Sequence, residues 1–272
     1  MRDILFSTEI EEGIYLISAT KKSGMSIEEL TKPQEATANS YLVVGDEKTL
    51  LFDLAVNQEG LWDYACSLTD KPVQLVLSHG HVDHIFHLNK REEVWLHSKD
   101  MDMVRNGVPG VNGPTNPCPV LHPLNEGDVI ELGNRKLTVF HIPGHTPGSI
   151  LLLDQKTRFL LSGDSIARRL LFGVGSEVKL APFCEKVKQL KEIDFKGAYS
   201  AHDRCALPKS HLKRMLETIE NAQKNGKKVK IPFVGQFLTY KCGKETELDY
   251  CDVAIYESKE ESKKGIYKSI AD

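Results

Sequence analysis

The segment SHGHVDH, residues 78–84, carries four side chains that could bind metal ions. Imidazole and carboxylate groups together are the ligand set of borderline divalent metals, above all zinc. Residues two apart in an extended loop point the same way, so His79 and His81 can hold one ion. Asp83 and His84 come where the chain turns into a predicted helix, and they can reach a second ion nearby.

Three further candidate ligands lie in separate segments of the chain. His145 lies in IPGHTPGS, Asp164 in LLSGDS and His202 in YSAHDR. Each follows a predicted strand directly, at the start of a loop or helix. Four strand ends therefore deliver seven candidate ligands, of which five are His and two are Asp.

In this order, the motifs resemble those of the metallo-β-lactamase superfamily. The resemblance runs from Tyr41 to about His202 and includes the leading stretch NSYLVVGDEKTLLFD. It implies an α/β fold in the form of a four-layer αββα sandwich, with two sheets face to face and helices outside. It also implies a dinuclear metal site at one edge of the sandwich.

The family pattern implies that His79, His81 and His145 bind the first metal, that Asp83, His84 and His202 bind the second, and that Asp164 bridges both. Asp53 matches a family position behind the ligands, where its carboxylate would orient the loop or a ligand through hydrogen bonds. In one departure, Ile85, Phe86 and His87 stand where many members have a small residue and a glycine. We therefore expect a bulkier wall beside the site.

Two neighbouring divalent ions can share a bound water and lower its pKa to near neutrality. We therefore expect a metal-dependent hydrolase in which a metal-bridging hydroxide attacks a small ester, thioester or lactone. One ion would polarise the carbonyl oxygen, and the other would stabilise the charge on the leaving group. Asp83 is the predicted catalytic residue, since the resemblance suggests that it holds or passes a proton. The expected cofactors are two zinc ions, with manganese or iron as alternatives.

Three other functions stay open on the same fold. One is a phosphodiesterase or nuclease-type hydrolase, which the absence of an evident RNA-gripping arm or large inserted domain disfavours. Another is an iron-dependent redox enzyme, disfavoured because the diiron branch of the family typically carries Glu where this chain has His81. The last is a metabolite-binding regulatory protein that keeps its metals.

The composition and charge of the chain limit the classes of molecule that it is expected to bind. With 40% hydrophobic and 27% charged residues among 272, the chain is not of a disordered type. The formal net charge of -3 leaves no basic excess to follow a phosphate backbone, so we expect a small-molecule substrate and no nucleic acid. No apolar run is long enough to span a bilayer, and the start MRDILFSTEIEEGIYL does not read as a signal peptide. We expect no membrane partner, a cytoplasmic location and six reduced cysteines. The sequence does not predict the oligomeric state.

Short apolar runs with the pattern of β-strands alternate along the chain with stretches that have the pattern of helices. Such elements are needed to hold the candidate ligands in place. Strands are predicted at Gly13–Ser18, Tyr41–Gly45, Thr49–Leu54, Val73–Ser78, Glu93–His97, Asp128–Leu132, Lys136–His141, Ser149–Asp154, Arg158–Ser162 and Gly197–Ala201. Helices are predicted at Gln58–Thr69, Val82–Leu88, Ser98–Asn106, Pro182–Ile193 and Pro208–Asn225. Lys21–Ser40 and Asn106–Pro119 are predicted to be long surface loops. Residues 1–230 are expected to form the catalytic domain, and residues 231–272 a strand extension with a charged tail packed on that domain.

Overall fold

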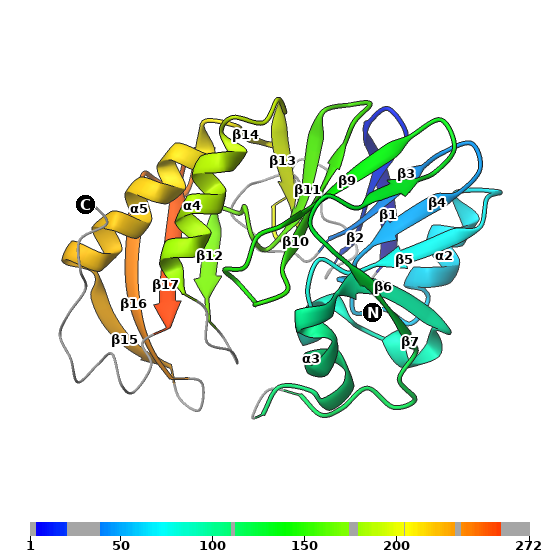
Figure 1. Cartoon of the computed structure of the whole chain (residues 1–272), viewed down its shortest axis with the longest axis horizontal. Helices are drawn as coiled ribbons and strands as arrows, with labels where there is room; N and C mark the ends of the chain where they lie inside the picture. Colours follow the sequence, from blue (N-terminus) through cyan, green and yellow to red (C-terminus); the bar gives the residue numbers. More distant parts are fainter. Residues whose placement is uncertain are drawn as a thin grey trace.

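Two large β-sheets form the centre of the computed structural model, which describes residues 4–20, 39–109, 112–173, 179–203, 205–231 and 235–256 (Figure 1). The seven-stranded sheet has the order β1 (Ile4–Glu11), β2 (Ile14–Thr20), β3 (Ser40–Val44), β4 (Thr49–Phe52), β5 (Val73–Val76), β6 (Glu93–His97) and β7 (Val120–Leu124). Its first three pairings are antiparallel and its last three are parallel.

The six-stranded sheet has the order β14 (Leu207–Pro208), β13 (Gly197–Ser200), β11 (Phe159–Gly163), β10 (Ile150–Asp154), β9 (Lys136–His141) and β8 (Val129–Glu131). Only the β11–β13 pair is parallel. A tight turn at Gly133-Asn134 joins β8 to β9, and Gly133 has a φ of 94° that favours glycine.

Alternating side chains bury both faces of each sheet. Ile150 and Leu152 of β10 face the core between the two sheets, whereas Leu151 and Leu153 face the layer of helices outside. In the same way Leu51 of β4 points outward, and its neighbours on the strand point inward. A strand covered on both faces reads as a continuous apolar run, as LLF in β4 and ILLL in β10 do here.

Helices cover the outer faces and complete the four layers of the predicted αββα sandwich. They are α2 (Leu61–Ser67) and α3 (Met101–Asn106) on the seven-stranded sheet, and α4 (Leu180–Leu190) and α5 (His211–Asn225) on the six-stranded sheet. The predicted helix at Val82–Leu88 is wrong in extent. A single 3-10 turn, Val82–His84, stands there, because the backbones of Leu54 and Ile85 then pair and bend the chain away.

A third sheet, beside α4 and α5 in Figure 1, has four strands in the order β12 (Arg169–Phe172), β17 (Cys251–Tyr256), β16 (Gly235–Cys242) and β15 (Lys227–Ile231). It joins three C-terminal strands to one strand from the middle of the chain, and its apolar residues share a core with α4 and α5. The division at residue 230 stays a prediction, and the charged tail, residues 257–272, lies outside the described residues.

The two-residue strand β14 stands where the prediction begins a helix at Pro208, and α5 starts three residues later at His211. Strands β1, β7 and β12 are also absent from the prediction. Polar residues interrupt the first, Pro123 interrupts the second, and the third is only four residues long. The predicted loop Lys21–Ser40 falls largely on residues 21–38, outside the described part of the chain. The six cysteines are free thiols, including Cys242 and Cys251, which face each other across β16 and β17. Within the described ranges, no helix combines the length and apolar character needed to cross a bilayer.

A buried ion pair links the two large sheets at one end. Arg135, 2% exposed, donates to both carboxylate oxygens of Asp154 at 2.9 and 2.7 Å. The same guanidinium donates to the carbonyl oxygens of Val44, in β3 of the other sheet, and of Glu12, in the turn between β1 and β2. One side chain thus satisfies acceptors in both layers of the sandwich.

Replacing this arginine should destabilise the whole fold. In Arg135→Met the Asp154 carboxylate stays buried without its partner, which costs about 3–5 kcal/mol in comparable pairs. Urea denaturation should show that loss in the free energy of unfolding. Lys136→Met is the control, because its pair with Glu131 is exposed and contributes under about 1 kcal/mol. Equal losses in the two variants would contradict this account.

Candidate metal centre

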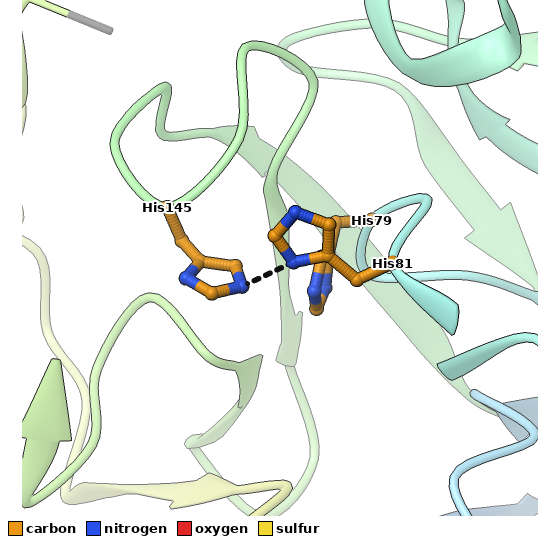
Figure 2. Close-up of side chains that lie close together, drawn as sticks. All are labelled: His79, His81 and His145. Atoms are coloured by element: carbon orange, nitrogen blue, oxygen red, sulfur yellow. Dashed lines mark hydrogen bonds between the residues drawn. The ribbon is translucent and has the colours of Figure 1, made fainter. Parts of the chain in front are cut away.

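The seven candidate ligands come together at one edge of the two large sheets, in two groups. His79, His81 and His145 form one group, and Asp83, His84, Asp164 and His202 form the other. Within each group the ligand atoms lie within 4.8 Å of one another. Figure 2 shows the first group, where the three imidazoles converge from two separate loops.

Strand ends deliver these side chains, as expected. His79 and His81 follow β5, and His145 lies in the loop from β9 to β10. Asp164 and His202 follow β11 and β13, which are parallel neighbours with their carboxyl ends at the same edge. The predicted loops after four strands therefore meet at one place.

The carboxylate of Asp164 lies between the two groups. Its Oδ1 is 3.3 Å from Nε2 of His84, and its Oδ2 is 3.2 Å from Nε2 of His202. The same Oδ2 is 3.5 Å from Nε2 of His145 in the first group. This position is the one expected of a bridging ligand.

Hydrogen bonds behind the imidazoles fix which nitrogen faces the centre. The Ser78 hydroxyl donates its single proton to Asp53 at 2.7 Å, so Nδ1 of His79 is the donor in its 2.9 Å contact with that hydroxyl. Nδ1 of His84 donates to Asp53 at 2.9 Å, and Nδ1 of His145 donates to the carbonyl oxygen of Leu171 at 2.6 Å. In each ring Nε2 is then left facing the site, a common arrangement of metal ligands.

Several of these inward-facing atoms are buried without a partner, which tests whether metal ions fit. Nε2 of His79, Nε2 of His84 and Oδ1 of Asp164 are buried and make no hydrogen bond within the described residues. Buried polar atoms are normally satisfied, so such a cluster needs protons or cations between its members. The donor set of imidazole and carboxylate suits zinc and similar divalent ions.

Two histidines of the first group, His79 and His145, are held neutral. Burial lowers the pKa of His79 well below its usual value, and the neighbouring imidazoles of His84 and His145 lower it further. Burial also lowers the pKa of His145. A neutral imidazole can bind a cation without first losing a proton.

The second group holds protons and charge instead. Asp164 raises the pKa of His202 to about 10. Burial alone would lower the pKa of His84, but Asp164 and Asp53 outweigh it and raise that pKa well above its usual value. Burial would raise the pKa of Asp83, but the hydrogen bond from His202 brings it to about 2. Cations entering this group must therefore displace protons.

Three features around the site go beyond or against the prediction. Ile85 packs into the core outside the seven-stranded sheet, so it does not thicken the wall of the site as expected. The Leu171 carbonyl on β12 left no signal in the sequence, since every residue has one. Asp100, whose carboxylate bonds the two loops of the first group, was missed because its position at the start of a helix reads as a simple cap.

The sequence profile of the metallo-beta-lactamase superfamily matches residues 34–177, just over half of the chain. The chain belongs to this superfamily. The match includes six of the seven candidate ligands, all except His202.

Curated relatives share about half of the chain. The acyl-coenzyme A thioesterase MBLAC2 of Gallus gallus is 35% identical over 159 residues, covering 47% of this chain and 57% of the relative. The hydroxyacylglutathione hydrolase of Chelativorans sp. is 27% identical over 172 residues, covering 57% and 62%. The alignments thus span about three fifths of these relatives.

Solved structures agree on the fold. A metallo-beta-lactamase from Pontibacter korlensis superposes with a TM-score of 0.61 at 16% identity, covering 80% of this chain and all of that one. At this identity the likeness supports the architecture and nothing finer. It confirms the sandwich expected from the sequence.

Zinc binding should release protons from the second group. At pH 7 His202, with a pKa of about 10, carries a proton that competes with the metal, so affinity there should rise with pH up to that value. Calorimetric titration of zinc in two buffers of different ionisation enthalpy counts the protons. His202→Gln should release about one proton fewer than the wild type, and His122→Gln, outside both groups, should match the wild type. Identical heats in the two buffers would contradict this.

Proposed function

We propose that this chain is a metal-dependent hydrolase that cleaves a thioester. The observation that carries the proposal is the pair of ligand groups meeting at Asp164, with Nε2 of His79 and of His84 buried without a hydrogen bond among the described residues. Such a constellation fits two neighbouring cations better than it fits a structural cluster, because five imidazoles and two carboxylates gathered without ions leave buried polar atoms unsatisfied.

The residues divide between the two ions as the family resemblance implies. His79, His81 and His145 would hold one, Asp83, His84 and His202 the other, with Asp164 between them. When bound, the ions would lower the pKa of water and polarise the carbonyl oxygen of the substrate. Zinc suits this donor set, with manganese or iron as alternatives.

Asp83 is the candidate catalytic residue of the chain itself. Its side chain is 42% exposed, and its Oδ2 lies 3.6 Å from Nε2 of His202. With a pKa of about 2, it is ionised at neutral pH and accepts a proton only weakly. Its suitable task is therefore to accept a hydrogen bond from the attacking water and orient it, more than to remove the proton outright.

The choice of a thioester comes from the relatives. Two of them, the thioesterase MBLAC2 and the hydroxyacylglutathione hydrolase, carry names that point to thioester substrates. A small ester or a lactone presents the same kind of acyl carbon to the attacking water, so both remain candidate substrates. The net charge of -3 supports a small-molecule substrate over a nucleic acid. No observation on this chain favours the phosphodiesterase, iron-redox or regulatory alternatives.

Thioester cleavage should depend on metal. We expect zinc-loaded protein to release free thiol from acyl-coenzyme A or S-acylglutathione, detected with a thiol-reactive dye, faster than it cleaves matched oxygen esters, lactones or bis-(p-nitrophenyl) phosphate. Chelation should abolish the release, and added zinc should restore it. Undiminished turnover by metal-free protein would refute the hydrolase mechanism. Cleavage of the phosphodiester alone would instead indicate a phosphodiesterase.

Asp83→Asn should lower turnover more than it lowers substrate affinity. The amide keeps the size of the side chain but loses its charge, and a loss of about 100-fold or more in kcat is expected for a group that orients the reacting water. The measurement is made at saturating zinc with the bound metal quantified, because Asp83 is also a candidate ligand. His122→Gln, whose partner is Glu93 at the far end of β6, is the control. An Asp83→Asn protein with two bound metals and full kcat would contradict the assignment.

A further inference from the structure

Asp100 is a fully buried carboxylate that lies between the two loops of the first ligand group. It receives the N–H of Gly80 at 3.0 Å, from the loop that carries His79 and His81. From the loop that carries His145, it receives the hydroxyl of Thr146 at 2.6 Å and the N–H of Gly148 at 2.6 Å. One side chain thus bonds the backbones of two loops that are far apart in the sequence.

This carboxylate does not serve the helix that it precedes. Asp is a preferred residue at a helix start, where its side chain usually accepts an N–H from the first turn. Asp100 stands at that position before α3 but makes no capping hydrogen bond. Its acceptors are directed to the other two loops, so helix capping does not account for it.

Close approach of the His145 loop to Asp100 requires a glycine. A Cβ at position 148 would lie 2.6 Å from the carboxyl carbon of Asp100 and 2.8 Å from its backbone nitrogen. Position 80 is also tight, since a Cβ there would lie 3.2 Å from the carbonyl oxygen of Asp100. The small residues and the carboxylate therefore form one arrangement that draws the loops together.

We propose that Asp100 is a positioning residue that sets the distance between His145 and the His79–His81 pair, and so selectively supports metal binding by that group. This inference rests on the proposed function, because it assumes that the three histidines bind an ion. Among the described residues, Asp100 makes no hydrogen bond to Asp83, His84, Asp164 or His202. The second group has its own carboxylate, Asp53, which receives Nδ1 of His84.

Asp100→Asn tests the proposal with little change in volume. Its three donors need a group that only accepts, whereas an amide offers one oxygen and one NH₂. Whichever way the amide turns, the N–H of Gly80 or of Gly148 loses its acceptor, and one loop is released. Loss of such a supporting contact typically weakens metal affinity by about 10–100-fold.

The readout is the stepwise affinity for Zn²⁺, measured by competition with a chromophoric chelator. His145→Ala and His202→Ala serve as references that assign each binding step to one group. We expect Asp100→Asn to weaken the step that His145→Ala removes by about 10–100-fold and to leave the other step within about twofold. If Asp100→Asn does not fold, Thr146→Val, which removes one donor, should weaken the same step less.

Asp154→Asn is the matched control for general destabilisation. Asp154 is also a fully buried, hydrogen-bonded carboxylate, but it lies at the far end of β10, about 16 Å along the strand from Ser149. The Asp154→Asn variant should have a lower free energy of unfolding than the wild type and unchanged affinities for both zinc-binding steps. Equal weakening of both steps in Asp100→Asn, or no weakening of either, would overturn the proposal. A wild-type protein that binds no zinc would overturn the proposed function itself, and this inference with it.

Discussion

A mostly buried carboxylate facing several imidazoles is the interaction on which the site depends. Asp164 lies within 3.5 Å of histidine nitrogens from both ligand groups. Removing a charge from water is costly unless opposite charge is close by. Without metal, protons on His84 and His202 supply that charge. Under the proposed function, cations would replace these protons when they bind.

The sandwich offsets the unfavourable free energy of this polar cluster, because it fixes the backbone on both sides of the site. Strands whose two faces are both covered, such as β11, leave little freedom to the loops that follow them. Behind those loops, buried carboxylates bond backbone N–H groups and ring nitrogens, as Asp53 does for Ser78 and His84. The histidines are thus already oriented, so an ion that binds as proposed would not have to order their side chains.

The sequence predicted the ligand clusters better than it predicted the frame around them. His79, His81 and His84 can be recognised in the sequence because this combination of residue types and spacing is rare. Strands with strong apolar runs, such as β10, can be recognised by their continuous hydrophobic pattern. The polar strand β1 and the short strand β12 left none, because their pairing comes from partners distant in the chain. Backbone groups such as the Leu171 carbonyl carry no residue signature, and Asp100 resembles an ordinary cap until the groups that donate to its carboxylate are seen. Which metal each group binds stays a prediction.

The origin of the Leu171 carbonyl has a consequence for biosynthesis. That oxygen orients His145, and it belongs to β12, an edge strand whose one partner in its sheet is β17. Domains form progressively as the chain leaves the ribosome, from the N-terminus onward. All the candidate ligands emerge well before β17 does, but the strand that holds one of them in place gains its neighbour only once residues 251–256 are free. If His145 binds an ion as proposed, its full alignment requires the last described strand, and a nascent chain stalled before residues 251–256 would carry the candidate ligands without that alignment.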